Sequence, residues 1–111
     1  MPFERGRDHW LWVGGPVPPG ADAITIGPLV SIRRGAASDP RLLRHELEHV
    51  RQWRALGATG FLRRYLGAYF RFRLRGYGHW GAYRRIPLEV EAEWVARTEG
   101  PPSRRRSSGD A

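Results

Sequence analysis

Glycine and proline divide this sequence into short segments, and that division limits the fold more than any other feature. Gly14-Gly15 ends the first segment, and a loop containing prolines at positions 16, 18 and 19 follows it. Later breaks fall at Gly57, Gly76-Tyr77-Gly78 and Gly100-Pro101-Pro102. Because glycine and proline interrupt helices and strands, we expect two extended segments followed by three helical ones.

The two N-terminal segments are predicted to be strands. Residues 9 to 13, His-Trp-Leu-Trp-Val, form the first. The second covers Ala23 to Arg34 and is rich in β-branched residues, which favour strands. Gly27-Pro28 in its middle predicts a turn or a bulge. A small sheet or ribbon should result.

Three helices are predicted after the strands. The first covers residues 40 to 56, with Ser38 or Asp39 as its cap, Pro40 in its first turn and Gly57 after its end. The second covers Phe61 to about Arg75, and the third begins at Pro87 and stops before Gly100. The predicted fold class is α+β, in one domain over residues 1 to 100. Residues 101 to 111 are expected to be a disordered Arg/Ser-rich tail.

Composition excludes several kinds of site. The chain contains no cysteine, which rules out disulfides, a thiol nucleophile and a cysteine metal site. Its 111 residues contain no apolar run long enough to cross a bilayer and no signal-peptide core, so we expect a cytoplasmic location. All nineteen basic residues are arginine and the net charge is +8, which permits binding to nucleic acid or anionic lipid.

The first predicted helix contains His45-Glu46-Leu47-Glu48-His49, an HExxH motif. Residues four apart lie one turn apart on the same helix face, so both imidazoles can reach one cation. Glu46 lies beside that face and can take a proton from metal-bound water without being a ligand. The alternative is that these residues lie on a solvated face with no metal.

A third ligand is needed, because catalytic zinc sites commonly use three protein ligands. The metzincin arrangement requires Gly at 52 and His at 55, where this chain has Gln52 and Ala55. The third predicted helix offers Glu89, Glu91 and Glu93 instead. Glu93 shares the face of Glu89 and stays open as the ligand, whereas Glu91 points away. These three can also form an acidic stripe paired with arginines.

His45-Glu46-x-x-His49 followed by Glu89-x-x-Ala92-Glu93 resembles the gluzincin family of zinc peptidases, and in size the chain resembles the small minigluzincins. The resemblance implies that His45, His49 and Glu89 bind zinc, that Glu46 is the general base and that Glu93 orients a ligand histidine. It also implies a peptide or protein substrate, paired in extended form along the Ala23 to Arg34 region. Glu93 departs from the aspartate common in the family.

Several other residues are candidates for roles in the site. Tyr77 is predicted as a catalytic hydrogen-bond donor to an oxyanion, with His79 and Tyr83 as alternatives. Gln52 lies near the histidine face and has either a hydrogen bond in the site or a packing role. His9 is expected to be a strand residue without chemistry.

The segment from Phe61 to Arg75 alternates aromatic and basic side chains. We expect it to supply core contacts through Phe61, Leu62, Tyr65, Leu66, Tyr69 and Phe72. The alternative is contact with an anionic membrane or RNA. Two other functions stay open for the protein. The first is that of a latent or non-catalytic zinc-binding protein, and the second is that of an Arg-rich module that binds nucleic acid or membrane surfaces.

Overall fold

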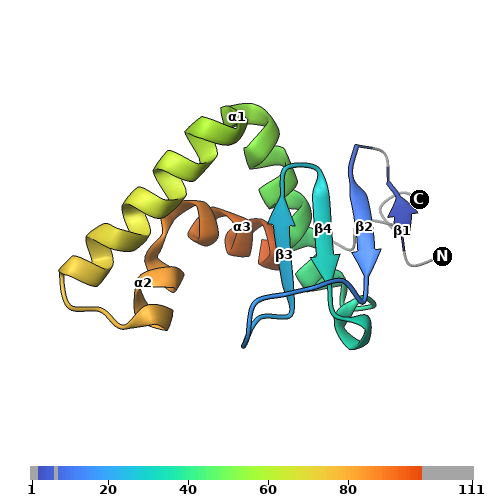
Figure 1. Ribbon diagram of the computed structural model, residues 1–111, viewed down its shortest axis with the longest axis horizontal. Coiled ribbons are helices and arrows are strands. Elements are labelled where there is room, and N and C mark those ends of the chain that lie inside the picture. Colours follow the sequence, from blue (N-terminus) through green and yellow to red (C-terminus); the bar gives the residue numbers. More distant parts are fainter. Residues whose placement is uncertain (1–2, 7, 99–111) are drawn as a thin grey trace.

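The computed structural model describes residues 3–6 and 8–98, and the predicted tail at 101–111 lies outside this range. It confirms an α+β fold, with a four-stranded N-terminal sheet followed by three helices (Figure 1). The elements are β1 (Phe3–Arg5), β2 (Trp10–Val13), β3 (Ala23–Ile26), β4 (Leu29–Ile32), a 3-10 turn (Arg34–Ala36), α1 (Pro40–Leu74), α2 (His79–Arg85) and α3 (Pro87–Thr98).

The sheet has the strand order β1-β2-β4-β3. β3 and β4 form an antiparallel hairpin closed at Gly27-Pro28, where Gly27 has φ +60°, so the predicted turn is confirmed. β2 pairs in parallel with β4, and β1 pairs antiparallel with β2. β1 was not predicted, because three residues are too few to show the alternation of apolar and polar side chains that indicates a strand. β3 is an edge strand and packs beside α1.

Helix α1 begins where its capping residues predict. The Asp39 side chain accepts hydrogen bonds from the backbone N–H groups of Arg41 (3.0 Å) and Leu42 (3.4 Å), and Pro40 occupies the first turn. Gly57 was predicted to end the first helix, but it instead makes a kink with φ 74° and ψ 165°. The helix resumes directly, so the two predicted helices are the two halves of α1.

Replacing Gly57 by alanine should lower the free energy of unfolding by about 1–3 kcal/mol, because its φ and ψ lie in a region essentially restricted to glycine. No atom lies within 4 Å of the position of an added Cβ, so the cost is one of backbone conformation. Gly67→Ala is the matched control: it has similar space but lies within the helix, and should stabilise the protein by about 0.5–1 kcal/mol. Equal effects in urea unfolding would contradict the assigned kink.

The core lies between the sheet and the first half of α1. Val30 and Ile32 of β4 and Val50 of α1 are buried together. Leu43 and Leu47 lie on the same stripe of α1 as Val50 and pack against them. Burying this stripe fixes the rotation of α1 about its axis. The histidines of the same helix therefore face α3.

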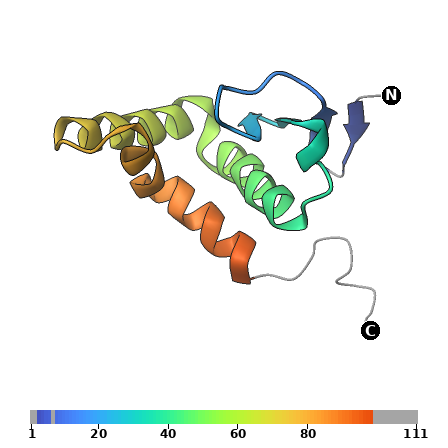
Figure 2. The same ribbon diagram turned by 90° about the horizontal axis from the view of Figure 1, so that it is seen from below.

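Helix α3 lies alongside the first half of α1 (Figure 2). Ala92 and Ala96 are fully buried, and their small side chains let the two helices approach closely. The Arg44 guanidinium crosses between the helices and donates from Nε to the Ala96 carbonyl at 2.9 Å. The short helix α2 was not predicted, because it has only seven residues between Gly78 and Ile86.

The predicted core stripe of residues 61–75 is wrong in part. Phe61 is buried, and Tyr65 is partly buried on the same side. Leu62 and Leu66, assigned to the core, are instead exposed. The kink at Gly57 sets which face of this half of α1 turns inward, and sequence spacing did not reveal it. Within the described residues, none of the helices combines the length and apolar character needed to cross a bilayer.

Candidate metal centre

Helical pitch and packing bring two histidines and one glutamate together. His45 and His49 lie one turn apart on α1, and Glu89 faces them from the first turn of α3. Glu89 Oε1 is 2.8 Å from His45 Nε2 and 3.1 Å from His49 Nε2. One potential ligand atom from each residue lies within 4.8 Å of the others, and all three residues are buried. Glu91 and Glu93 are not in this cluster.

The outer nitrogens of both imidazoles are occupied. His45 Nδ1 is 3.1 Å from Glu93 Oε1, and His49 Nδ1 is 2.8 Å from Gln52 Oε1. A carboxylate and an amide oxygen only accept, so each Nδ1 is the donor. In the neutral ring, each Nε2 then carries a lone pair directed at the centre of the cluster.

Gln52 can offer only its oxygen to His49. Its Nε2 donates to the Leu88 carbonyl at 3.0 Å and to Glu91 Oε1 at 2.7 Å, which fixes the orientation of the amide. Gln52 is buried, so these bonds are shielded from water. Of the two roles open for Gln52, hydrogen bonding in the site is the one observed. Glu91 contributes through Gln52 and not as a neighbour of the histidines.

The inner atoms of the cluster are His45 Nε2, His49 Nε2 and Glu89 Oε1, and His45 Nε2 lies within hydrogen-bond distance of Glu89 Oε1 at 2.8 Å. His49 Nε2 is buried and has no hydrogen-bond partner, because its approach to Glu89 lacks the required geometry. Burial lowers the pKa of His49, but the adjacent Glu89 carboxylate outweighs it and the net pKa is raised. Burial raises the pKa of Glu89, but the two histidines lower it by more, so the net pKa of Glu89 is well below its usual value. The cluster thus favours a positive charge at its centre, and its N, N, O donor set suits zinc.

Glu46 is buried next to the cluster but is held by the sheet. Thr25 Oγ1 of β3 donates to Glu46 Oε1 at 2.7 Å. Glu46 directly follows His45 on α1, and its negative charge helps to raise the pKa of His49. Glu46 is not part of the His45, His49 and Glu89 cluster, and its role as a general base stays a prediction. Sequence reasoning missed Thr25, since a threonine within a strand gives no sign of its partner.

Tyrosines line the cluster, although not the one predicted. The hydroxyl of Tyr65 donates to Glu89 Oε2, and burial together with the Glu89 charge raises its pKa. Tyr83 is similarly affected by burial, then by Glu89 and Glu46, so its pKa is also raised. Both hydroxyls therefore stay protonated at neutral pH and can act as donors.

Tyr77 is not brought to the cluster. Its ring lies 4.0 Å from the Arg85 guanidinium carbon and packs edge-on against Phe72. In the part of the chain that the structure describes, no hydrogen bond or ring contact joins Tyr77 to the histidines or Glu89. His79 bonds instead to the Tyr69 hydroxyl at 2.9 Å, and His9 lies 3.6 Å from Asp8.

An aromatic wall covers one side of the cluster. Trp53 stacks on Phe61 with ring centroids 4.3 Å apart, and Phe61 stacks on Tyr65 at 5.4 Å. The His49 ring makes T-shaped contacts with the rings of Phe61 and Tyr65, with centroid distances of 6.1 and 6.3 Å. Trp53 precedes Gly57 and Phe61 follows it, so the kink at Gly57 brings the two rings into contact. Such a wall excludes water and strengthens electrostatic interactions at the cluster.

Glu93 links the cluster to two arginines. It accepts hydrogen bonds from Arg41 Nη1 at 2.8 Å and from Arg97 Nε at 2.7 Å. Burial raises the pKa of Glu93, but Arg97, His45 and Arg41 lower it by more, so the net pKa is lowered. Glu93 thus stays ionised while it accepts from His45.

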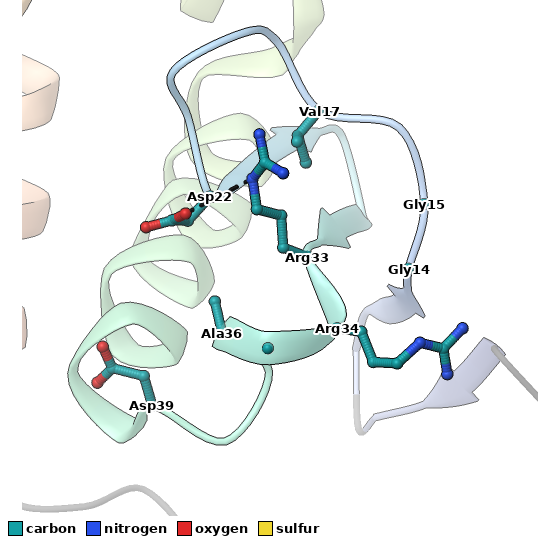
Figure 3. A pocket seen from close by; sticks show the side chains of 9 residues that line it. Gly14, Gly15, Val17, Asp22, Arg33, Arg34, Ala36 and Asp39 are labelled. Atoms are coloured by element: carbon teal, nitrogen blue, oxygen red, sulfur yellow. Dashed lines mark ion pairs between the residues drawn. The ribbon is translucent and has the colours of Figure 1, made fainter.

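A separate hollow of about 830 Å³ lies beside the start of α1 (Figure 3). Arg33 and Arg34 line it, but Arg33 is 3.6 Å from Asp22 and also donates to the Ala21 carbonyl at 2.8 Å. The positive charge of Arg33 is therefore already paired with Asp22. None of the cluster residues borders this hollow.

Comparison with known proteins gives no family for this chain: no family model, curated protein or solved structure matches it. The site must therefore be judged on its own chemistry.

Proposed function

We propose that this chain is a zinc-dependent peptidase of the gluzincin type, with His45, His49 and Glu89 as ligands. One observation carries the proposal: two imidazole nitrogens and a carboxylate oxygen converge in a buried cluster while both outer nitrogens are held by Glu93 and Gln52. Such outer hydrogen bonds are typical of histidines that bind metals. The buried His49 Nε2, which has no hydrogen-bond partner, also supports a cation at this position.

A zinc ion held there would supply a Lewis acid and an acidified water molecule. Glu46, placed by Thr25, takes a proton from the attacking water and delivers it to the leaving amine. Tyr65 fixes the second oxygen of Glu89. Tyr83, whose pKa is raised by burial and by the charges of Glu89 and Glu46, replaces Tyr77 as the proposed donor to the developing oxyanion.

The substrate proposed is a peptide in extended conformation. β3 is an edge strand of the described sheet, and it carries the threonine that holds Glu46. A peptide added along this edge would gain main-chain hydrogen bonds and place its backbone next to the general base. The exposed Ile26 at the end of β3 is available for contact with a substrate side chain.

The test is cleavage of a mixture of unstructured peptides, analysed by mass spectrometry. Zinc-loaded protein should produce new termini, and a chelator or His49→Ala should suppress them. Equal cleavage by wild-type protein and His49→Ala would reveal a contaminant and contradict the proposal. Zinc binding without cleavage of any peptide would favour the non-catalytic zinc-binding alternative.

Thr25→Val should lower kcat by about tenfold or more while zinc affinity stays unchanged. Valine has the same shape but cannot donate to the buried Glu46 carboxylate, and hydrogen bonds to charged groups contribute about 1.5–3 kcal/mol. Thr25→Ser keeps the hydroxyl and is the matched control, with activity near that of the wild type. If valine and serine reduced kcat equally, packing in β3 and not the hydrogen bond would be the cause.

A further inference from the structure

The outward face of the second half of α1 is apolar and uncovered. Leu62, Leu66, Phe70 and Leu74 recur every four residues, and their exposures are 42%, 45%, 57% and 88%. We call these four residues the outer stripe. The opposite face of the same helix is the one that packs, through Phe61 and Tyr65, against the cluster and α3. The outer stripe therefore has no role in forming the core.

The segment that contains the outer stripe carries positive charge alone. Between Gly57 and Ile86 the sequence has seven arginines and no aspartate or glutamate: Arg63, Arg64, Arg71, Arg73, Arg75, Arg84 and Arg85. Elsewhere arginines pair with acids, as Arg41 and Arg97 do with Glu93. Within the described residues, none of the seven forms an ion pair with a carboxylate. Arg73 donates to the Tyr69 hydroxyl, Arg75 lies over the Phe72 ring, and Arg85 donates to the Gly81 carbonyl.

From this combination we infer that the second half of α1 docks on an anionic lipid surface. Apolar side chains that enter the lipid interface, flanked by cations that meet the headgroups, are the requirements for a helix lying in that plane. Long arginine side chains next to the stripe can extend to the headgroups while their carbon chains stay in apolar surroundings. Figure 2 shows this half of α1 extending away from the sheet, where a flat surface can reach it.

Two other occupants are less compatible with this surface. A second copy of the chain would place these arginines against the same arginines, with no acid in the segment to offset the repulsion. Single-stranded nucleic acid is bound largely by stacking on aromatic rings. Three of the four residues in the outer stripe are leucines, which bury in hydrocarbon but do not stack.

Vesicle flotation tests this inference with the full chain. Vesicles of equal parts phosphatidylcholine and phosphatidylglycerol should bind the protein, vesicles of phosphatidylcholine alone should not, and added salt should weaken the binding. Leu62→Ser/Phe70→Ser/Leu74→Ser should lower the affinity by at least about tenfold. Trp94→Ser is the matched control, because Trp94 is 64% exposed on α3 and should not contribute.

Charge is tested separately. Arg63→Gln/Arg71→Gln should weaken binding by about 30-fold, whereas Arg5→Gln/Arg34→Gln removes the same net charge elsewhere and should have little effect. If both pairs weakened binding equally, or if the serine variant bound as well as the wild type, the interaction would be general adsorption and the inference would fail. Binding of an RNA oligonucleotide in preference to the anionic vesicles would also overturn it.

The absence of cysteine permits a direct readout of contact. Leu66→Cys carrying an environment-sensitive fluorophore should shift its emission to the blue on the anionic vesicles, and the same label at Trp94→Cys should not. Circular dichroism verifies that each variant is folded. Equal shifts at both positions would contradict docking through the outer stripe. Zinc content should be the same with and without vesicles, since the outer stripe faces away from the cluster.

Discussion

Replacing Glu89 by alanine is expected to weaken zinc binding by more than about 100-fold, because it removes one of the three proposed ligands. Glu93→Ala should cost about 10- to 100-fold, the loss typical of a residue that orients a ligand. Glu91→Ala should cost less than about tenfold, since Glu91 acts only through Gln52. Zinc titration against a competing chelator gives all three affinities.

The three variants control for one another. Each removes one carboxylate from the same helix within five residues, so a general change in charge would affect them alike. A larger loss for Glu93→Ala than for Glu89→Ala would exchange the two roles and contradict the geometry described above. Equal small losses in all three would indicate that the acids form a structural ion network.

Glu46→Gln is expected to keep zinc and to lower kcat by about 10²- to 10⁴-fold, the usual contribution of a general base. Glutamine retains an oxygen that can accept from Thr25, so the side chain should stay in place while losing its basicity. The measurement is steady-state cleavage by zinc-loaded protein of any peptide found to be a substrate.

Glu48→Gln is the control for that substitution. Glu48 lies in the same motif and is equally buried, but it pairs with Arg51, so its loss should affect stability more than turnover. Wild-type rates in Glu46→Gln would remove Glu46 as the general base. Parallel losses of kcat in both variants would point to damage to α1 instead.

Much of this architecture follows from local signals in the sequence. Asp39 and Pro40 predict the start of α1, the β-branched residues predict β3 and β4, and Gly27-Pro28 predicts the turn between them. The His45/His49 pair follows from helical pitch alone. These features depend on residues near one another in the chain, where steric preference and hydrogen bonding act directly.

The features that the sequence did not predict depend on contacts between helices and strands that are far apart in the chain. Gly57 predicts an interruption, but its φ and ψ decide the direction of the second half of α1. That direction brings Tyr65 rather than Tyr77 to Glu89 and leaves Leu62 outside the core. Thr25 was missed for a similar reason, because its contact with Glu46 joins residues 21 positions apart.

Whether His45, His49 and Glu89 hold zinc is decided by the zinc content of the purified chain. Protein loaded with zinc and dialysed against metal-free buffer should retain close to one zinc per chain by elemental analysis, and His45→Ala and His49→Ala should each retain almost none. Wild-type protein without bound zinc, or undiminished zinc in both histidine variants, would contradict the account.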